Sequence, residues 1–173
     1  MKRFAIHGIR FPFVLLPALI LFGCAGAWFP SDFAGPDNRI AFGHAGTEHA
    51  GVWGTGDLSL SYRYVLAEES AGFEGELTLQ PRVGEFTTLH RLVFRVHFLD
   101  GEGRILESRV LLASPYRQWM PLAPLSFQRR LALPEGAVAF GFSYDGAAGE
   151  GGGSGEGSDL RSGGTDWEFW SLP

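Results

Sequence analysis

The chain of 173 residues has a single cysteine, Cys24, and a single lysine, Lys2. One cysteine cannot form an internal disulfide, nor can it supply a CxxC redox or metal motif. Without a lysine beyond residue 2, the body of the chain has no residue for a Schiff base, a P-loop or a kinase-type site. The sequence therefore excludes several common enzyme classes before any pattern is considered.

Positive charge is also scarce. The chain has 14 Lys and Arg against 19 Asp and Glu, a formal charge of −5. Residues 24–173 contain eleven arginines, no lysine and nineteen acidic residues, which gives a formal charge of −8. Proteins that bind nucleic acid present a basic face to the phosphates. We therefore expect no nucleic-acid partner.

The N-terminus has the features of an export signal. A basic start, Met1-Lys2-Arg3, precedes a twelve-residue apolar run at positions 11–22 that Pro12 and Pro17 interrupt. A membrane-spanning helix needs about 20 apolar residues, whereas this length is typical of the apolar region of a signal peptide. The sequence predicts a signal peptide over residues 1–23.

The run ends in Leu21-Phe22-Gly23-Cys24, which resembles the lipobox of bacterial lipoproteins, although Phe22 is bulkier than the usual residue there. The resemblance implies cleavage before Cys24 and lipidation of its thiol. Two acyl chains on one residue would anchor the protein stably, at about 0.8 kcal/mol per buried CH₂. Ala25 stands where Asp commonly marks retention in the inner membrane, so the resemblance favours the outer membrane, facing the periplasm. An ordinary secretory signal and an uncleaved anchor are the alternatives.

Beyond the anchor, the chain reads as short strands. Residues 24–56 are rich in glycine and predict a flexible tether, and from Leu58 apolar residues recur at every second position. We expect strands near residues 58–66, 73–80, 89–99, 104–112, 125–133, 138–144 and 167–172, and no helix of ten or more residues. This pattern predicts an all-β domain over residues 57–173. The expected architecture is an antiparallel β-sandwich of about seven strands, immunoglobulin-like, with a small β-barrel of lipocalin type as the alternative.

One segment breaks the alternation. Nine of the 22 residues at positions 145–166 are Gly and five are acidic. Such a segment predicts a mobile loop, because it offers little apolar surface to offset its ordering entropy. The alternative is a calcium loop built from carboxylates. Its ligands would be Asp145, Glu150, Glu156, Asp159 and Asp166.

Two groups of residues are candidates for recognition. Arg91, Arg95 and His97 are predicted on the outward face of one strand, with Arg63 or Arg109 as additions from neighbours. Such a face could bind carboxylates or phosphates, or could pair with Glu74, Glu76 or Glu107. The second group is the connection at positions 114–121, whose Tyr116, Arg117 and Trp119 are residue types common in interface cores. It could equally pack over the edge of the sandwich.

We find no catalytic or metal-binding motif. His90 and His97 lie at odd separation in one strand, and the cluster His44, Glu48, His49 lies in the tether, where no element fixes its geometry. We therefore expect no metal and no cofactor. The expected function is a non-enzymatic binding or structural module that meets the membrane through its lipid and binds an envelope protein or a glycan. An envelope hydrolase without a recognisable motif is the alternative.

The body also has a loose resemblance to small uncharacterised bacterial envelope lipoproteins. The resemblance rests on two segments, Phe98-Leu99-Asp100-x-x-Gly103 and Phe140-Gly141-Phe142-Ser143-Tyr144-Asp145-Gly146. The resemblance implies an envelope location and no activity.

Overall fold

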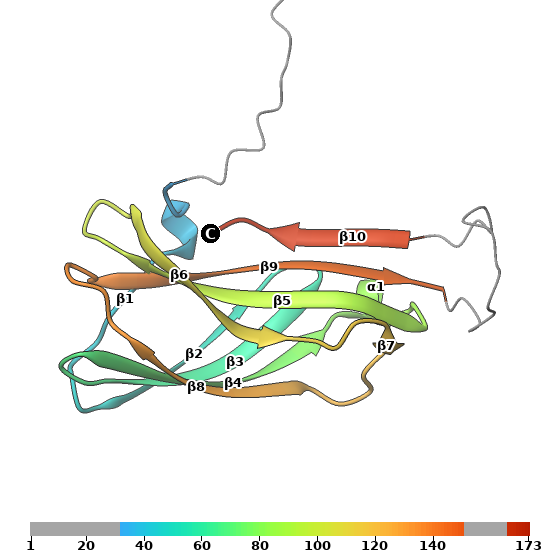
Figure 1. Ribbon diagram of the computed structural model, residues 1–173, viewed down its shortest axis with the longest axis horizontal. Coiled ribbons are helices and arrows are strands. Elements are labelled where there is room, and N and C mark those ends of the chain that lie inside the picture. The colour runs from blue at the N-terminus through green and yellow to red at the C-terminus, as the bar shows by residue number, and fades with distance from the viewer. Residues whose placement is uncertain (1–31, 151–165) are drawn as a thin grey trace, which may run out of the picture.

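Two antiparallel sheets pack face to face in a computed structural model that describes residues 32–150 and 166–173 (Figure 1). The first sheet contains β1 (Ile40–Ala41), β5 (Thr88–Leu99), β6 (Ile105–Ala113), β7 (Gln118–Trp119), β9 (Ala139–Gly149) and β10 (Asp166–Ser171). The second contains β2 (Glu48–Gly54), β3 (Leu58–Leu66), β4 (Ser70–Leu79) and β8 (Leu125–Ala132). The helices described are η1 (Pro36–Asn38) and α1 (Pro81–Gly84). The predicted β-sandwich is confirmed, and the barrel alternative is wrong because the sheets do not close.

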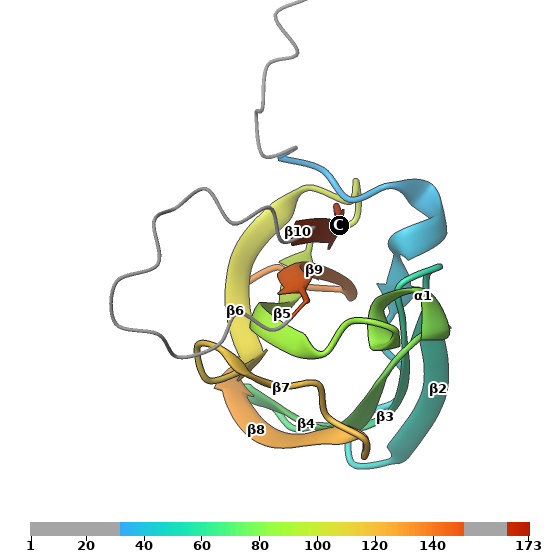
Figure 2. The same cartoon turned by 90° about the vertical axis from the view of Figure 1, so that its right-hand side faces the viewer.

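The order of the six-stranded sheet places β9 and β5 at its centre. The strands run β1-β9-β5-β6, with β10 on the same edge of β9 as β1, and β7 beside the start of β5. The four-stranded sheet runs β2-β3-β4-β8. Figure 2 shows β6 and β8 side by side, where the chain crosses from one sheet to the other through β7.

Alternating side chains fill the space between the sheets. The row predicted to face inward from β5, which is Leu92, Phe94, Val96 and Phe98, is fully buried. β9 adds Phe140, Phe142 and Tyr144, and several ring pairs of the core meet edge to face, such as Phe73–Phe140 with centroids 5.3 Å apart. Edge-to-face packing suits the quadrupoles of aromatic rings. The inward and outward faces of β5 are therefore as the alternation predicts.

A glycine makes room for the edge strand β10. Phe169 lies directly opposite Gly146 of β9 and is 2% exposed. A Cβ at residue 146 would overlap the Phe169 ring, so only glycine lets the ring lie against the backbone of β9. This contact fixes β10 beside β9, with the neighbouring side chains of β10 on the outer face of the sheet.

The sandwich begins earlier than residue 57, so the predicted extent of the tether is wrong. β1 and β2 lie within the range 24–56 and pair with β9 and β3. His49, Gly51 and Trp53 alternate inward along β2, but the glycine carries no side chain that would reveal the period. The indole of Trp53 packs on Phe94, 5.8 Å between centroids.

The acidic, glycine-rich segment is also shorter than predicted. β9 extends to Gly149 and β10 begins at Asp166, so both ends of the predicted loop belong to strands. Residues 151–165 lie outside the described residues, and with them Glu156 and Asp159 of the calcium hypothesis. Asp145 itself lies in the sheet, where arginines surround it.

Candidate binding cleft

A cleft of about 640 Å³ lies on the outer face of the six-stranded sheet. Its floor is formed by side chains of β5, β6 and β9. One wall is β10 with the residues after it, Leu172 and Pro173, and Asp32 and Ile105 close the end next to the β5–β6 turn. The volume is within the range of small-molecule sites.

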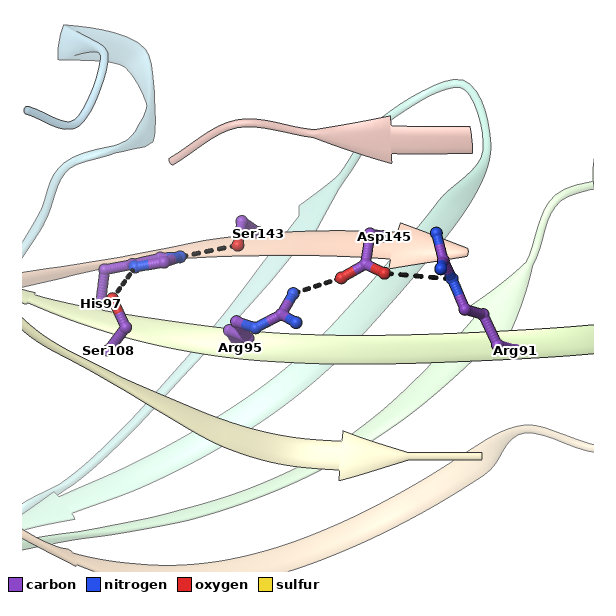
Figure 3. A network of polar contacts seen from close by, with 6 residues as sticks. All are labelled: Arg91, Arg95, His97, Ser108, Ser143 and Asp145. Carbon is purple, nitrogen blue, oxygen red and sulfur yellow. Dashed lines mark hydrogen bonds and ion pairs between the residues drawn. The ribbon is translucent and has the colours of Figure 1, made fainter. Parts of the chain in front are cut away.

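The register of β5 against β9 assembles the polar groups of the floor. Arg95 pairs with Ser143 and Val93 with Asp145, so the odd-numbered residues 91–97 of β5 share the outer face with these two residues of β9. Figure 3 shows Arg91, Arg95 and His97 of β5 directed toward Ser143 and Asp145 of β9. The structure thus places the three predicted residues of β5 on one face.

Asp145 lies between the two arginines. Its Oδ1 forms an ion pair with the Nε of Arg91 at 3.3 Å, and its Oδ2 accepts a hydrogen bond from Arg95. Both arginines line the cleft, and 52% of the Arg91 side chain and 34% of the Arg95 side chain are accessible. This set of Arg91, Arg95 and Asp145, here called the ion triad, has fixed donors beside a fixed acceptor.

Arg63 and Arg109, the predicted additions to this face, do not lie beside the ion triad. Arg63 lies in the four-stranded sheet and donates to Glu74 at 2.9 Å, while Arg109 pairs with Glu107 on β6. Pairing with Glu74 or Glu107, the alternative to a binding face, therefore holds for Arg63 and Arg109 but is wrong for Arg91 and Arg95. Their partner is Asp145, which the sequence had placed in a loop because of the glycines that follow it.

His97 is on the predicted face but is 6% exposed. Two serine hydroxyls bracket its ring, Ser108 Oγ at 2.7 Å from Nδ1 and Ser143 Oγ at 2.6 Å from Nε2. Burial, with the positive charge of Arg95 added, lowers the pKa of His97 to about 4. The ring is therefore neutral at pH 7, with one nitrogen donating to a serine and the other accepting from a serine.

Trp170 forms the exposed wall of the cleft. It lies directly opposite Asp145 in the β9–β10 register, and it is 58% exposed. Sequence reasoning did not identify Trp170, Ser108 or Ser143 as site residues, and it named Asp145 only as a calcium ligand in a predicted loop. The alternation of Ser143 and Asp145 with the inward Phe142 and Tyr144 is a signal that could have identified the two β9 residues.

The second predicted group lies elsewhere. Tyr116 and Trp119 are 74% and 81% exposed, and the Arg117 guanidinium lies over the Tyr116 ring, 5.4 Å from its centroid. Trp119 pairs with Thr88 at the start of β5, whereas Asp32 reaches the cleft near the other end of that strand. The structure does not bring Tyr116, Arg117 and Trp119 to the cleft, and their rings do not cover the sandwich edge.

A buried polar contact joins the sheets beneath the cleft. Tyr144 donates its hydroxyl to Asp57 Oδ2 at 2.8 Å, and Asp57 Oδ1 also faces Arg82 Nε at 3.4 Å. Desolvation of Tyr144, with Asp57 beside it, raises the pKa of this phenol to about 12. The contact supports the strand that carries Ser143 and Asp145.

No family model, no curated protein and no solved structure matches the chain. Within residues 32–150 and 166–173, no group of three or more His, Cys, Asp or Glu side chains is placed to hold a metal ion. In the same residues no helix has the length and apolar character needed to cross a membrane.

Proposed function

We propose that the protein is a non-enzymatic binding module of the bacterial cell envelope, anchored through lipidated Cys24 and holding its ligand in the cleft on the six-stranded sheet. The observation that carries the proposal is the ion triad. Its donors and acceptor are held by ion pairs before any ligand arrives, while both arginine side chains stay partly accessible. Preorganised polar groups in a half-open cleft are typical of binding sites.

The position of the cleft supports a ligand near the membrane. Asp32, which closes one end of the cleft, is eight residues beyond Cys24. A fully extended chain of that length spans at most about 28 Å. The cleft therefore stays close to the lipid anchor, at the periplasmic face of the outer membrane, which is the location that the lipobox resemblance favours.

A hydrolase is the second candidate, and the geometry around His97 is the observation that favours it. Ser143, His97 and Ser108 form a hydrogen-bonded row like that of a serine hydrolase triad. The row has a serine where a triad has a carboxylate, so no negative charge would stabilise the imidazolium formed when His97 takes a proton. Arg95 opposes that charge, and a base with a pKa of about 4 is weak at neutral pH. The same residues serve better as a rigid floor for binding.

Photocrosslinking in the producing cell tests this proposal. A benzophenone amino acid replaces Leu172, which is 61% exposed at the cleft, or Val52, which is 78% exposed on the other sheet and serves as the matched control. We expect an adduct from position 172 in the membrane fraction and none from position 52. Equal adducts from both positions, or none from either, would contradict a binding cleft. Covalent labelling of Ser143 by a fluorophosphonate would favour the hydrolase.

A further inference from the structure

We propose that the ligand of the cleft is a neutral saccharide, with one sugar ring stacked on Trp170 and its hydroxyls bonded to the ion triad. This inference rests on the proposed function and names the class of ligand. It is carried by three observations: an exposed indole at the wall, fixed donors beside a fixed acceptor, and the charge balance of the lining.

Trp170 supplies the apolar half of the site. Its neighbour Phe169 anchors β10 against Gly146, so the indole is presented from a held strand, 58% exposed and lining the cleft. A large flat ring beside polar groups suits a ligand with one apolar face and a polar edge. A pyranose has this form, since its C–H bonds gather on one face and its hydroxyls point outward.

The ion triad supplies the polar half. Arginine donates only and an ionised aspartate accepts only. Each sugar hydroxyl both donates and accepts, so neighbouring hydroxyls match a guanidinium and a carboxylate that lie side by side. Asp145 lies directly opposite Trp170 in the register, which places this polar edge next to the indole.

The position and charge of the cleft disfavour other ligands. The ion triad lies on the face of β5 and β9, whose backbone groups bond to neighbouring strands, so a peptide placed over it could not be recognised through its backbone as an added strand is. The charged side chains of the lining are two arginines and three carboxylates, which are Arg91, Arg95, Asp32, Asp145 and Glu168. This balance gives no net attraction for an anion.

Calorimetric titration of the lipid-free domain from residue 25 onward tests the inference. The probes are three neutral trisaccharides, tri-N-acetylchitotriose, cellotriose and maltotriose, with trigalacturonate as the acidic counterpart. We expect at least one neutral probe to bind, with a Kd that changes by less than about twofold between low and high salt, because no ion pair with the ligand forms. Trp170→Ala is expected to weaken this binding by about tenfold or more, because the variant lacks the aromatic ring that the ligand would cover.

The matched controls are Trp119→Ala, an exposed tryptophan outside the cleft, and Arg63→Gln on the other sheet. Both should bind as the wild type does. Thermal melting of each variant establishes that it is folded before it is titrated. Because Trp170→Ala could loosen β10, Asp145→Asn provides a second test on the central strand, and it should also lose the neutral probe.

Three results would overturn the inference. If trigalacturonate binds tightly and high salt weakens it, the ligand is anionic and the neutral class is wrong, although the cleft remains a binding site. If a neutral probe binds equally to Trp170→Ala and Asp145→Asn, the saccharide site lies elsewhere. If none of the four binds while crosslinking at position 172 succeeds, the proposed function survives and the saccharide assignment fails.

Discussion

His97 makes the stability of the domain depend on pH in a calculable way. In the unfolded chain this histidine titrates with its ordinary pKa of 6.5, whereas in the fold burial and Arg95 lower it to about 4. Below pH 6.5 the unfolded state therefore binds a proton that the folded state does not. The contribution of His97 is fully present above pH 6.5 and is lost as the pH falls toward 4.

The expected magnitude follows from linkage. Between neutral pH and about pH 4.5 the two pKa values imply a loss of about 2.5 kcal/mol in the free energy of unfolding. Because the ring is buried, solvent screening takes little from this value. Carboxylates elsewhere titrate in the same interval, so the wild type alone would not isolate the effect of one group.

Urea denaturation at the two pH values, on the wild type and on His97→Gln, separates that effect. The glutamine keeps an acceptor and donors for Ser108 and Ser143 but does not titrate. We expect the variant to lose less stability on acidification than the wild type does, by about 2 to 3 kcal/mol. His44→Gln, which replaces an exposed histidine, should lose as much stability on acidification as the wild type does. Equal losses in His97→Gln and wild type would refute the account of the cleft floor.

Three other outcomes are expected. Phe94→Ala should lower the free energy of unfolding by about 3–5 kcal/mol in a denaturant titration, because it leaves a cavity in the core, whereas Arg95→Ala should lower it by less than about 1 kcal/mol. The opposite order would mean that β5 faces the other way. Tyr144→Phe should cost about 1–3 kcal/mol in the same assay, since the buried carboxylate of Asp57 loses its donor; an unchanged midpoint would contradict this role. Cys24→Ser should lose palmitate labelling, stay as an uncleaved precursor and leave the detergent phase, and labelling equal to wild type would exclude the lipoprotein.

The strands that carry large apolar side chains could be predicted from sequence. β3, β5 and β8 have such residues at alternate positions, and their predicted ranges differ from the observed ones by at most one residue. β2 was missed because its inward row includes Gly51, over which the side chain of Tyr62 lies. β1 and β7, of two residues each, are too short for a period to show. An absent Cβ hides the alternation on which such predictions depend.

The β5 side of the candidate site could be predicted from the sequence, but the β9 and β10 side could not. The alternation of β5 places Arg91, Arg95 and His97 on one face, and the structure agrees. Asp145 was assigned to a loop because the glycines after it suggested that the strand ends there, but β9 continues through Gly149. Which strand lies beside β5 depends on contacts between distant segments, and local pattern does not encode that pairing. The exposed position of Trp170 follows from the docking of Phe169, which is also a long-range contact.

The central claim is that the cleft on the six-stranded sheet is where this protein binds its ligand, and nuclear magnetic resonance of the nitrogen-labelled domain tests it most directly. The chain has five tryptophans, whose indole N–H signals can be assigned by single substitution. The domain is titrated with the neutral trisaccharide that binds best. The account predicts that the indole signal of Trp170 and the side-chain Nε–H signal of Arg95 shift along saturating curves with the same midpoint. The indole signal of Trp119 should not shift. If the Trp119 signal moves while the signals of Trp170 and Arg95 stay unchanged, the account is contradicted and binding lies at the opposite end of β5.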